Sequence, residues 1–169
     1  MSKVTFHDNP VNLGGSLPAV GQAAPAFSLV GGDLAELSLA ALAGKTVVLN
    51  IVPSLDTPVC ALSAKRFNAA ATALANTVIV NVSADLPFAQ KRFCSAEKLA
   101  NIVNLSTFRA PDFGKSYGVA ILDSPLAGLL ARAVVVIDGN GKVVYTQLVP
   151  EIAQEPDYEP VLAAVKALA

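Results

Sequence analysis

The sequence predicts an α/β protein with a mixed central sheet and helices on both faces. Two apolar runs rich in β-branched residues, 46–52 and 77–82, enclose a stretch rich in Ala and Leu at 58–75. Strand, helix and strand in this order predict a parallel pair of strands joined by a crossover helix. A third run, 133–137, is followed by the turn sequence DGNGK and by the β-rich run 143–148, which together predict an antiparallel hairpin.

The individual elements follow from local patterns. Residues 46–52, TVVLNIV, form a short apolar run bounded by glycine and proline, which is typical of a central strand covered on both faces. A last helix is expected at about 156–168, because proline and acidic residues begin this segment and a lysine lies near its end. Residues 4–6 and the Gly/Pro-rich stretch up to Pro25 indicate an N-terminal extension with short strands. No linker or repeat divides the chain, so we expect a single domain of residues 1–169.

The composition excludes several classes of protein. The chain has 169 residues, 53% of them apolar, and a formal net charge of −1 with only 15% charged residues. A chain of this kind has no basic field for nucleic acid or for an anionic membrane, and neither is expected as a partner. Two cysteines and one histidine cannot build a Cys/His zinc cluster, since His7 is far in sequence from Cys60 and Cys94. No structural metal is expected.

No segment predicts a membrane span. The two longest charge-free stretches, 9–32 and 67–84, are interrupted by prolines and glycines or by polar residues. Residues 1–10 lack the basic segment and apolar run of a signal peptide, and a cytoplasmic location is therefore expected. In that reducing compartment, two cysteines are expected to be free or to carry redox chemistry rather than to form a structural disulfide.

The most informative segment is the octet PSLDTPVC at 53–60, between the central strand and the following helix. Thr57 is favoured as the helix N-cap and Pro58 as the first helical residue, which places Cys60 in the first turn. The positive end of a helix favours the thiolate form of cysteine, so Cys60 is a candidate nucleophile. The alternative is that Cys60 is a small buried apolar residue and that Thr57 is only a cap.

The second cysteine, Cys94, follows a segment that predicts a short helix at 86–93, with Gln90, Lys91 and Arg92 on its exposed side. This position suggests partial exposure. A nucleophilic and an accessible cysteine in one chain are what a resolving reaction needs, in which a sulfenic acid on the first condenses with the thiol of the second. The two cysteines do not form a C-x-x-C motif, which argues against a general disulfide reductase.

Arg132 comes directly before the buried run 133–137, at a strand end that would place it near the helix start carrying Cys60. There its charge would stabilise a thiolate and donate hydrogen bonds to a peroxide oxygen. The alternative is a solvated arginine that closes a strand. His7 is expected at the surface rather than as a base. The acidic residues in turn-like contexts are expected to form turns or caps; they are Asp85, Asp112 and Asp138.

These residues carry a resemblance to a known family. Pro53, Thr57 and Cys60 form the pattern P-x-x-x-T-x-x-C, which resembles the peroxidatic signature of the peroxiredoxins. Nearly the whole chain resembles the bacterial thiol peroxidase subfamily, which is of the atypical two-cysteine type with a disulfide formed within one subunit. The segments that carry this similarity are 83–94 with Cys94, 132–138 and 147–158.

The resemblance implies a thioredoxin-like fold with an N-terminal β-hairpin, a homodimer, and reduction of hydroperoxides at the expense of thioredoxin, without a metal or organic cofactor. It implies that Cys60 is the peroxidatic cysteine and Cys94 the resolving cysteine, and that they form the disulfide. Thr57 would orient the thiolate and the peroxide, Arg132 would activate both, and Pro53 would shape the pocket and shield Cys60.

Two other functions use the same cysteines. The first is a non-catalytic redox sensor or chaperone-like module that signals through an exposed apolar face. The second is a thiol-disulfide oxidoreductase, which the missing C-x-x-C motif disfavours. Steady turnover with a reductant would separate an enzyme from the sensor.

Overall fold

The computed structural model describes residues 2–169, and Met1 lies outside the described residues. Within this range a seven-stranded mixed sheet has the strand order β4-β3-β7-β6-β5-β8-β9. The strands of this sheet are β3 (Ser28–Val30), β4 (Glu36–Ser38), β5 (Thr46–Ile51), β6 (Thr77–Ser83), β7 (Val103–Ser106), β8 (Ala133–Ile137) and β9 (Val143–Leu148). The predicted α/β class is confirmed, as are the parallel pairing of β5 with β6 and the antiparallel β8–β9 hairpin.

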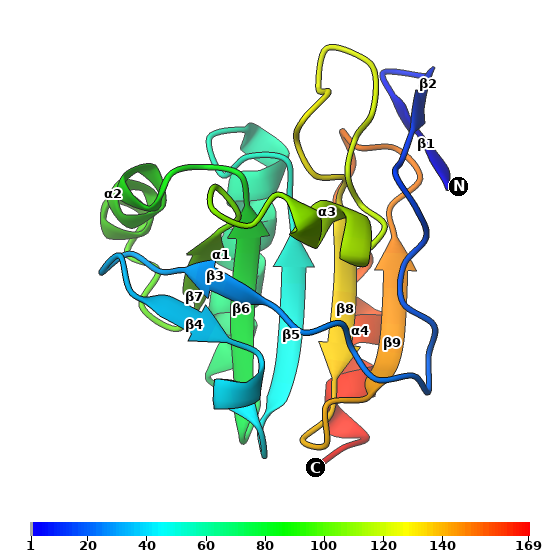
Figure 1. The fold of residues 1–169 in the computed structure, drawn as a ribbon. Coiled ribbons are helices and arrows are strands. Elements are labelled where there is room, and N and C mark those ends of the chain that lie inside the picture. The colour runs from blue at the N-terminus through cyan, green and yellow to red at the C-terminus, as the bar shows by residue number, and fades with distance from the viewer. Residues whose placement is uncertain (1) are drawn as a thin grey trace.

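Helices cover both faces of the sheet, as predicted (Figure 1). Helices α1 (Pro58–Ala71) and α4 (Tyr158–Lys166) pack on one face, together with part of α2 (Pro87–Glu97). The short helix α3 (Asp112–Ser116) and the N-terminal segment pack on the other face. Strand β5 is buried along its whole length because both of its faces are covered, and this explains its unbroken apolar sequence.

Several predicted boundaries are wrong by a few residues. Helix α1 ends at Ala71 rather than at residue 75, because the chain continues in turns and Asn76 takes a left-handed backbone conformation that leads into β6. Helix α4 begins after Asp157 and ends at Lys166, so it is shorter than the predicted 156–168. Helix α2 continues to Glu97, beyond the predicted end at residue 93.

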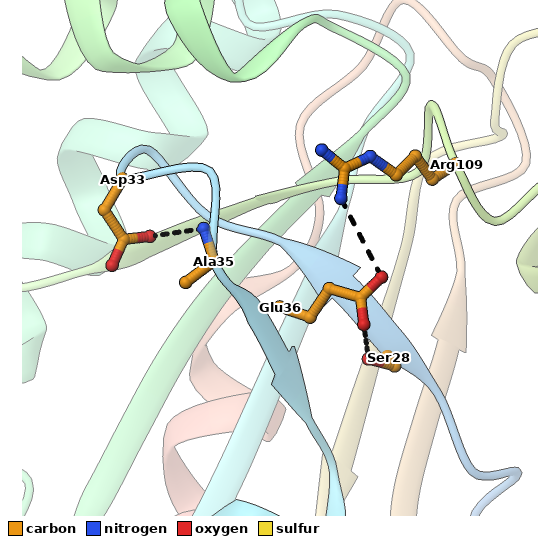
Figure 2. A network of polar contacts seen from close by, with 5 residues as sticks. All are labelled: Ser28, Asp33, Ala35, Glu36 and Arg109. Atoms are coloured by element: carbon orange, nitrogen blue, oxygen red, sulfur yellow. Dashed lines mark hydrogen bonds and ion pairs between the residues drawn. The ribbon is translucent and has the colours of Figure 1, made fainter.

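The β3–β4 hairpin forms one edge of the sheet and was not predicted. Its turn is held by Asp33, whose carboxylate accepts a hydrogen bond from the backbone N–H of Ala35. Across the strands the Ser28 hydroxyl donates to Glu36, and Arg109 approaches the same carboxylate from a neighbouring loop (Figure 2). Such exposed polar contacts contribute little to stability, but they order the edge of the sheet.

The N-terminal extension forms a separate antiparallel hairpin of β1 (Lys3–Phe6) and β2 (Asn9–Asn12), as the resemblance implied. It lies beside the loop before β8 and the loop after β9 (Figure 1). Its two-residue turn places both His7 and Asp8 at positive φ, which is the geometry of a type I′ turn. Neither residue is glycine, so this turn needs support from its surroundings.

Glu151, in the loop after β9, supplies that support. Its carboxylate accepts hydrogen bonds from the Thr5 hydroxyl at 2.6 Å and from the backbone N–H groups of His7 and Asp8. These donors, the Thr5 hydroxyl first among them, together with the Ala153 backbone N–H, lower the pKa of Glu151 to about 2. The backbone on both sides pairs as well, since Ile152 N–H donates to the Thr5 carbonyl. Glu151 therefore clamps the N-terminal hairpin to the sheet.

We expect Glu151→Gln to lower the melting temperature at neutral pH by roughly 2–4 °C, the shift that about 1 kcal/mol produces in a chain of this size. The pKa of Glu151 in the folded chain lies below its ordinary value of 4.5, so its contribution is complete above that value and is lost as the pH falls towards about 2. The melting temperatures of the wild type and the variant should therefore converge as the pH falls over this range. Glu159→Gln, at an exposed site, is the matched control, and a gap that stays constant down to the lowest pH would contradict the clamp.

Candidate active site

Cys60 lies where the sequence predicts, in the first turn of α1 at the end of the central strand. The helix begins at Pro58 with Thr57 as its N-cap residue, and Cys60 is completely buried. Pro58 has no backbone N–H, and in the described part of the chain no acceptor bonds the N–H groups of Val59 and Cys60. These free N–H groups and the positive end of the helix dipole make the N-terminal end of α1 suited to bind negative charge.

Thr57 occupies the N-cap position, but its side chain does not cap the helix. Its hydroxyl instead donates to the Ser54 carbonyl at 2.9 Å, because the side chain turns back towards the loop that follows β5. The hydroxyl proton is thus engaged, and the oxygen of Thr57 keeps its capacity to accept a hydrogen bond.

The same loop is anchored by Asp85, just after β6. Its carboxylate accepts hydrogen bonds from the Ser54 hydroxyl and the Leu55 N–H, both at 2.7 Å, and from the Ser83 hydroxyl. Asp85 is therefore more than the turn former that its sequence context suggests. No local signal in the sequence shows that it holds a loop about 30 residues away.

Arg132 reaches Cys60 because β8 runs antiparallel to β5. Ala133 pairs with Ile51, so the residue before β8 lies at the sheet edge where β5 ends. The Nη2 atom of Arg132 lies 3.3 Å from the Cys60 Sγ, and its Nε donates to the Ile152 carbonyl at 2.9 Å. The expected proximity of Arg132 and Cys60 is confirmed.

The interpretation of Arg132 as a solvated strand-end residue is wrong, since its exposed fraction is only 2%. A buried guanidinium is costly unless it is paired. Among residues 2–169 the ion pairs are Lys65 with Glu97 and Arg109 with Glu36, and none involves Arg132. Its Nη1 atom is buried without a hydrogen-bond partner. The Cys60 sulfur is in contact with this unpaired cation.

A cavity of about 290 Å³ opens beside this pair. Arg132, Thr57 and His7 contribute its polar side chains, and Pro53, which is itself buried, forms part of the wall. The remaining lining is apolar and comes from the N-terminal hairpin, α1 and two loops: Phe6, Pro58, Val59, Leu126, Ile152 and Ala153. The exposed position predicted for His7 is confirmed, but its place at the cavity was not predicted from the sequence.

Cys94 lies inside α2 rather than after its end, and it is half-buried. Burial raises the pKa of the Cys94 thiol, and a hydrogen bond from Asn104 on β7, with Nδ2 at 2.6 Å from Sγ, opposes that effect. The expected exposure of Gln90 is wrong: it is buried and donates to the Ser83 hydroxyl and the Leu105 carbonyl. Lys91 and Arg92 are exposed, as predicted.

The two cysteines are both free thiols and have different neighbours. Cys60 sits at the end of β5, whereas Cys94 is bonded to a residue of β7, with β6 between these strands. Two strand spacings amount to about 10 Å, and a disulfide needs Cα atoms within about 7 Å. This arrangement fits two thiols that meet only after part of the chain moves.

The other candidate residues have structural surroundings. Asp138 accepts hydrogen bonds from the backbone N–H groups of Asn140 and Lys142 in the β8–β9 turn, and Asp112 lies in the first turn of α3. Residues 2–169 contain no group of three or more His, Cys, Asp or Glu side chains placed to hold a metal ion. Over the same range, no helix has the length and apolar character needed to cross a membrane.

Comparisons with known proteins agree with this architecture. Residues 19–162 match the Redoxin family. The thiol peroxidase of Mycobacterium tuberculosis is 57% identical over 167 residues, which cover 99% of this chain and all of that protein. The crystal structure of a peroxiredoxin-like protein from Aquifex aeolicus superposes with a TM-score of 0.95 at 44% identity, covering 100% of this chain and 98% of the other.

A thiol peroxidase from Chromobacterium violaceum shares the fold, with a TM-score of 0.90 at 23% identity over 98% of this chain and 95% of the other. The thioredoxin-like fold implied by the sequence is confirmed. The chain belongs to the redoxin family and, within it, to the bacterial thiol peroxidases.

We expect Arg132→Met to slow the oxidation of Cys60 by hydroperoxide on the order of 10²-fold, since one preorganised donor to a developing anion is worth about that much. The reaction slows because the negative charge that develops on oxygen loses its adjacent cation. Reactions quenched at a series of times and quantified by intact mass give the rate. Arg109→Met, at an exposed arginine, is the control, and an unchanged oxidation rate in the Arg132 variant would reduce that residue to a structural role.

Proposed function

We propose that this thiol peroxidase reduces hydrogen peroxide and organic hydroperoxides through Cys60, forms an intramolecular disulfide with Cys94, and is regenerated by thioredoxin. The observation that carries the proposal is the buried guanidinium of Arg132, which contacts the Cys60 Sγ and has no carboxylate partner in the described residues. A buried cation that faces a cysteine at a helix N-terminus favours the thiolate, which is the nucleophilic form.

In the first step the Cys60 thiolate attacks the terminal oxygen of ROOH, and the O–O bond breaks. The sulfur is oxidised to sulfenic acid, and the leaving alkoxide takes a proton to give ROH. The unpartnered Nη1 of Arg132 and the free N–H groups at the start of α1 are suited to stabilise the negative charge that develops on oxygen. Thr57, with its own proton donated to Ser54, is suited to accept the hydrogen of the peroxide.

The cavity supports organic hydroperoxides as substrates. Its walls are apolar except at Arg132, Thr57 and His7, so an alkyl group fits the walls while the peroxide oxygens face the polar end. Leu126 belongs to the Leu-rich loop before β8 and Phe6 to the N-terminal hairpin. Pro53 closes one side, which is consistent with the shielding role that the family resemblance implies.

In the second step the Cys94 thiol attacks the sulfenic sulfur of Cys60, forming the S–S bond and releasing water. A thiolate of thioredoxin then attacks this disulfide, and exchange returns both cysteines to the reduced state. Thioredoxin as reductant and the homodimer rest on the family resemblance; both, and the cytoplasmic location expected from the sequence, stay predictions.

The division of roles between the cysteines is tested by adding one equivalent of an organic hydroperoxide to reduced protein. We expect the wild type to lose both thiols and about 2 Da at monomer mass, the mass of two thiol hydrogens. Cys94→Ser should still react once with peroxide but lose turnover with thioredoxin. Cys60→Ser should lose both reactions.

Three other results would each contradict a different part of this proposal. The reverse pattern in the two serine variants would exchange the roles of the cysteines. Two thiols that persist for minutes in the wild type would overturn the peroxidase mechanism. Turnover with a small dithiol but not with thioredoxin would contradict only the assignment of thioredoxin as the reductant.

A second prediction concerns movement. Because Cys60 lies at the end of β5 and Cys94 is bonded to β7, we expect residues 59–65 and 88–97 to lose protection from amide hydrogen exchange when the disulfide forms. Exchange in the reduced and oxidised proteins, followed by mass spectrometry of peptides, measures this loss. Peptides from β8 serve as the internal control, and equal protection of both segments in the two forms would contradict local unfolding.

A further inference from the structure

Three buried or partly buried asparagines lie side by side across the centre of the sheet. Asn50 on β5 pairs in register with Asn81 on β6, and Asn81 pairs with Asn104 on β7. Asn50 and Asn81 are completely buried. We call these three residues the asparagine ladder. It lies on the face covered by α1, where the neighbouring positions of β5 are Val48 and Val52.

The ladder is a continuous chain of hydrogen bonds. Asn50 donates to the Asn81 side-chain oxygen at 2.8 Å, and Asn81 donates to the Asn104 side-chain oxygen at 3.2 Å. Asn104 in turn donates to the Cys94 Sγ at 2.6 Å. One end of the ladder therefore terminates on a thiol.

The other end reaches the first turn of α1. Asn50 also donates to the Ser63 hydroxyl at 3.4 Å, and this hydroxyl donates to the Cys60 carbonyl at 3.0 Å. The hydrogen bonds of the ladder thus connect the backbone of one cysteine with the sulfur of the other.

The free-energy cost of burying the ladder is high for a purely structural feature. A carboxamide in an apolar core costs free energy unless it is hydrogen-bonded, and the side-chain oxygen of Asn50 is buried without a partner. Apolar residues at these positions would fill the same space without that cost. Buried polar networks do, however, fix one arrangement of the groups that they join.

We propose that Asn104, supported by Asn81 and Asn50, is a positioning residue that holds Cys94 in the folded enzyme and must release it before the disulfide can form. This inference rests on the proposed roles of Cys60 and Cys94. While the ladder is intact, the Cys94 thiol stays at β7 and Cys60 stays free to meet peroxide. When the first turn of α1 opens, the Ser63 contact to the Cys60 carbonyl is lost. The hydrogen bond from Asn104 to Cys94, at the opposite end of the ladder, weakens as a result.

The first test measures release of Cys94 without peroxide. In a Cys60→Ser background Cys94 is the only thiol, so its alkylation rate by N-ethylmaleimide reports how often it leaves the ladder. We expect Asn104→Leu to raise this rate about three- to tenfold, the range that loss of one buried hydrogen bond allows. Ser63→Ala, at the distant end, should raise it in the same direction by a smaller factor.

The second test measures the resolving step in the enzyme with both cysteines. After mixing with one equivalent of an organic hydroperoxide and quenching with acid, intact mass separates the sulfenic form, heavier by about 16 Da, from the disulfide, lighter by about 2 Da. We expect Asn104→Leu to speed conversion of the first into the second by the same factor, and to leave the initial oxidation of Cys60 unchanged. Less irreversible oxidation of Cys60 should follow at high peroxide.

Ser95→Ala is the matched control, because Ser95 is exposed beside Cys94 and makes no side-chain hydrogen bond in the described structure. An unchanged or slower alkylation rate in either the Asn104 or the Ser63 variant overturns the proposed role of the ladder, provided that a thermal melt shows that the variant is folded. If Asn104→Leu does not fold, the alkylation rates of Asn104→Ser and Ser63→Ala test the same proposal. Alkylation needs no peroxide, so failure of the peroxidase mechanism and failure of the ladder are separate results.

Discussion

The contact between the Arg132 guanidinium and the Cys60 sulfur is the interaction on which the rest of the site depends. It brings a permanent cation into the interior, where neither of the ion pairs found among residues 2–169 involves it. The antiparallel pairing of β8 with β5 makes this contact possible, because it places a strand start beside a strand end. The Ile152 carbonyl holds the other side of the guanidinium and so fixes its direction.

The N-terminal hairpin contributes to this site from a distance in sequence. Glu151 holds the strained turn of the hairpin, and the adjacent Ile152 holds Arg132. One short loop after β9 therefore supports both the cavity wall that contains Phe6 and the cation that faces Cys60. The low pKa of Glu151 keeps this clamp charged at neutral pH.

The fold and the proposed chemistry make opposite demands on the two cysteines. Close packing keeps Cys60 under Arg132 and Cys94 against β7, whereas a disulfide requires them to meet. Helix ends are the parts of a fold that open at low cost, and both cysteines lie near one: Cys60 in the first turn of α1, and Cys94 near the last turn of α2. In the proposed mechanism the asparagine ladder resists this opening, because its hydrogen bonds join the two places that would have to move.

The sequence by itself determined the α/β class, the parallel β5–β6 unit, the β8–β9 hairpin and the position of Cys60 in a first helical turn. These depend on apolar periodicity, turn residues and Pro58, which act over short distances. The tertiary structure decided that Gln90 is buried, that Arg132 is buried rather than solvated, that Asp85 holds the loop of Cys60, and that Asn104 bonds Cys94. Each of these contacts joins residues from different elements, and their pairing depends on strand order and register, which local pattern does not encode.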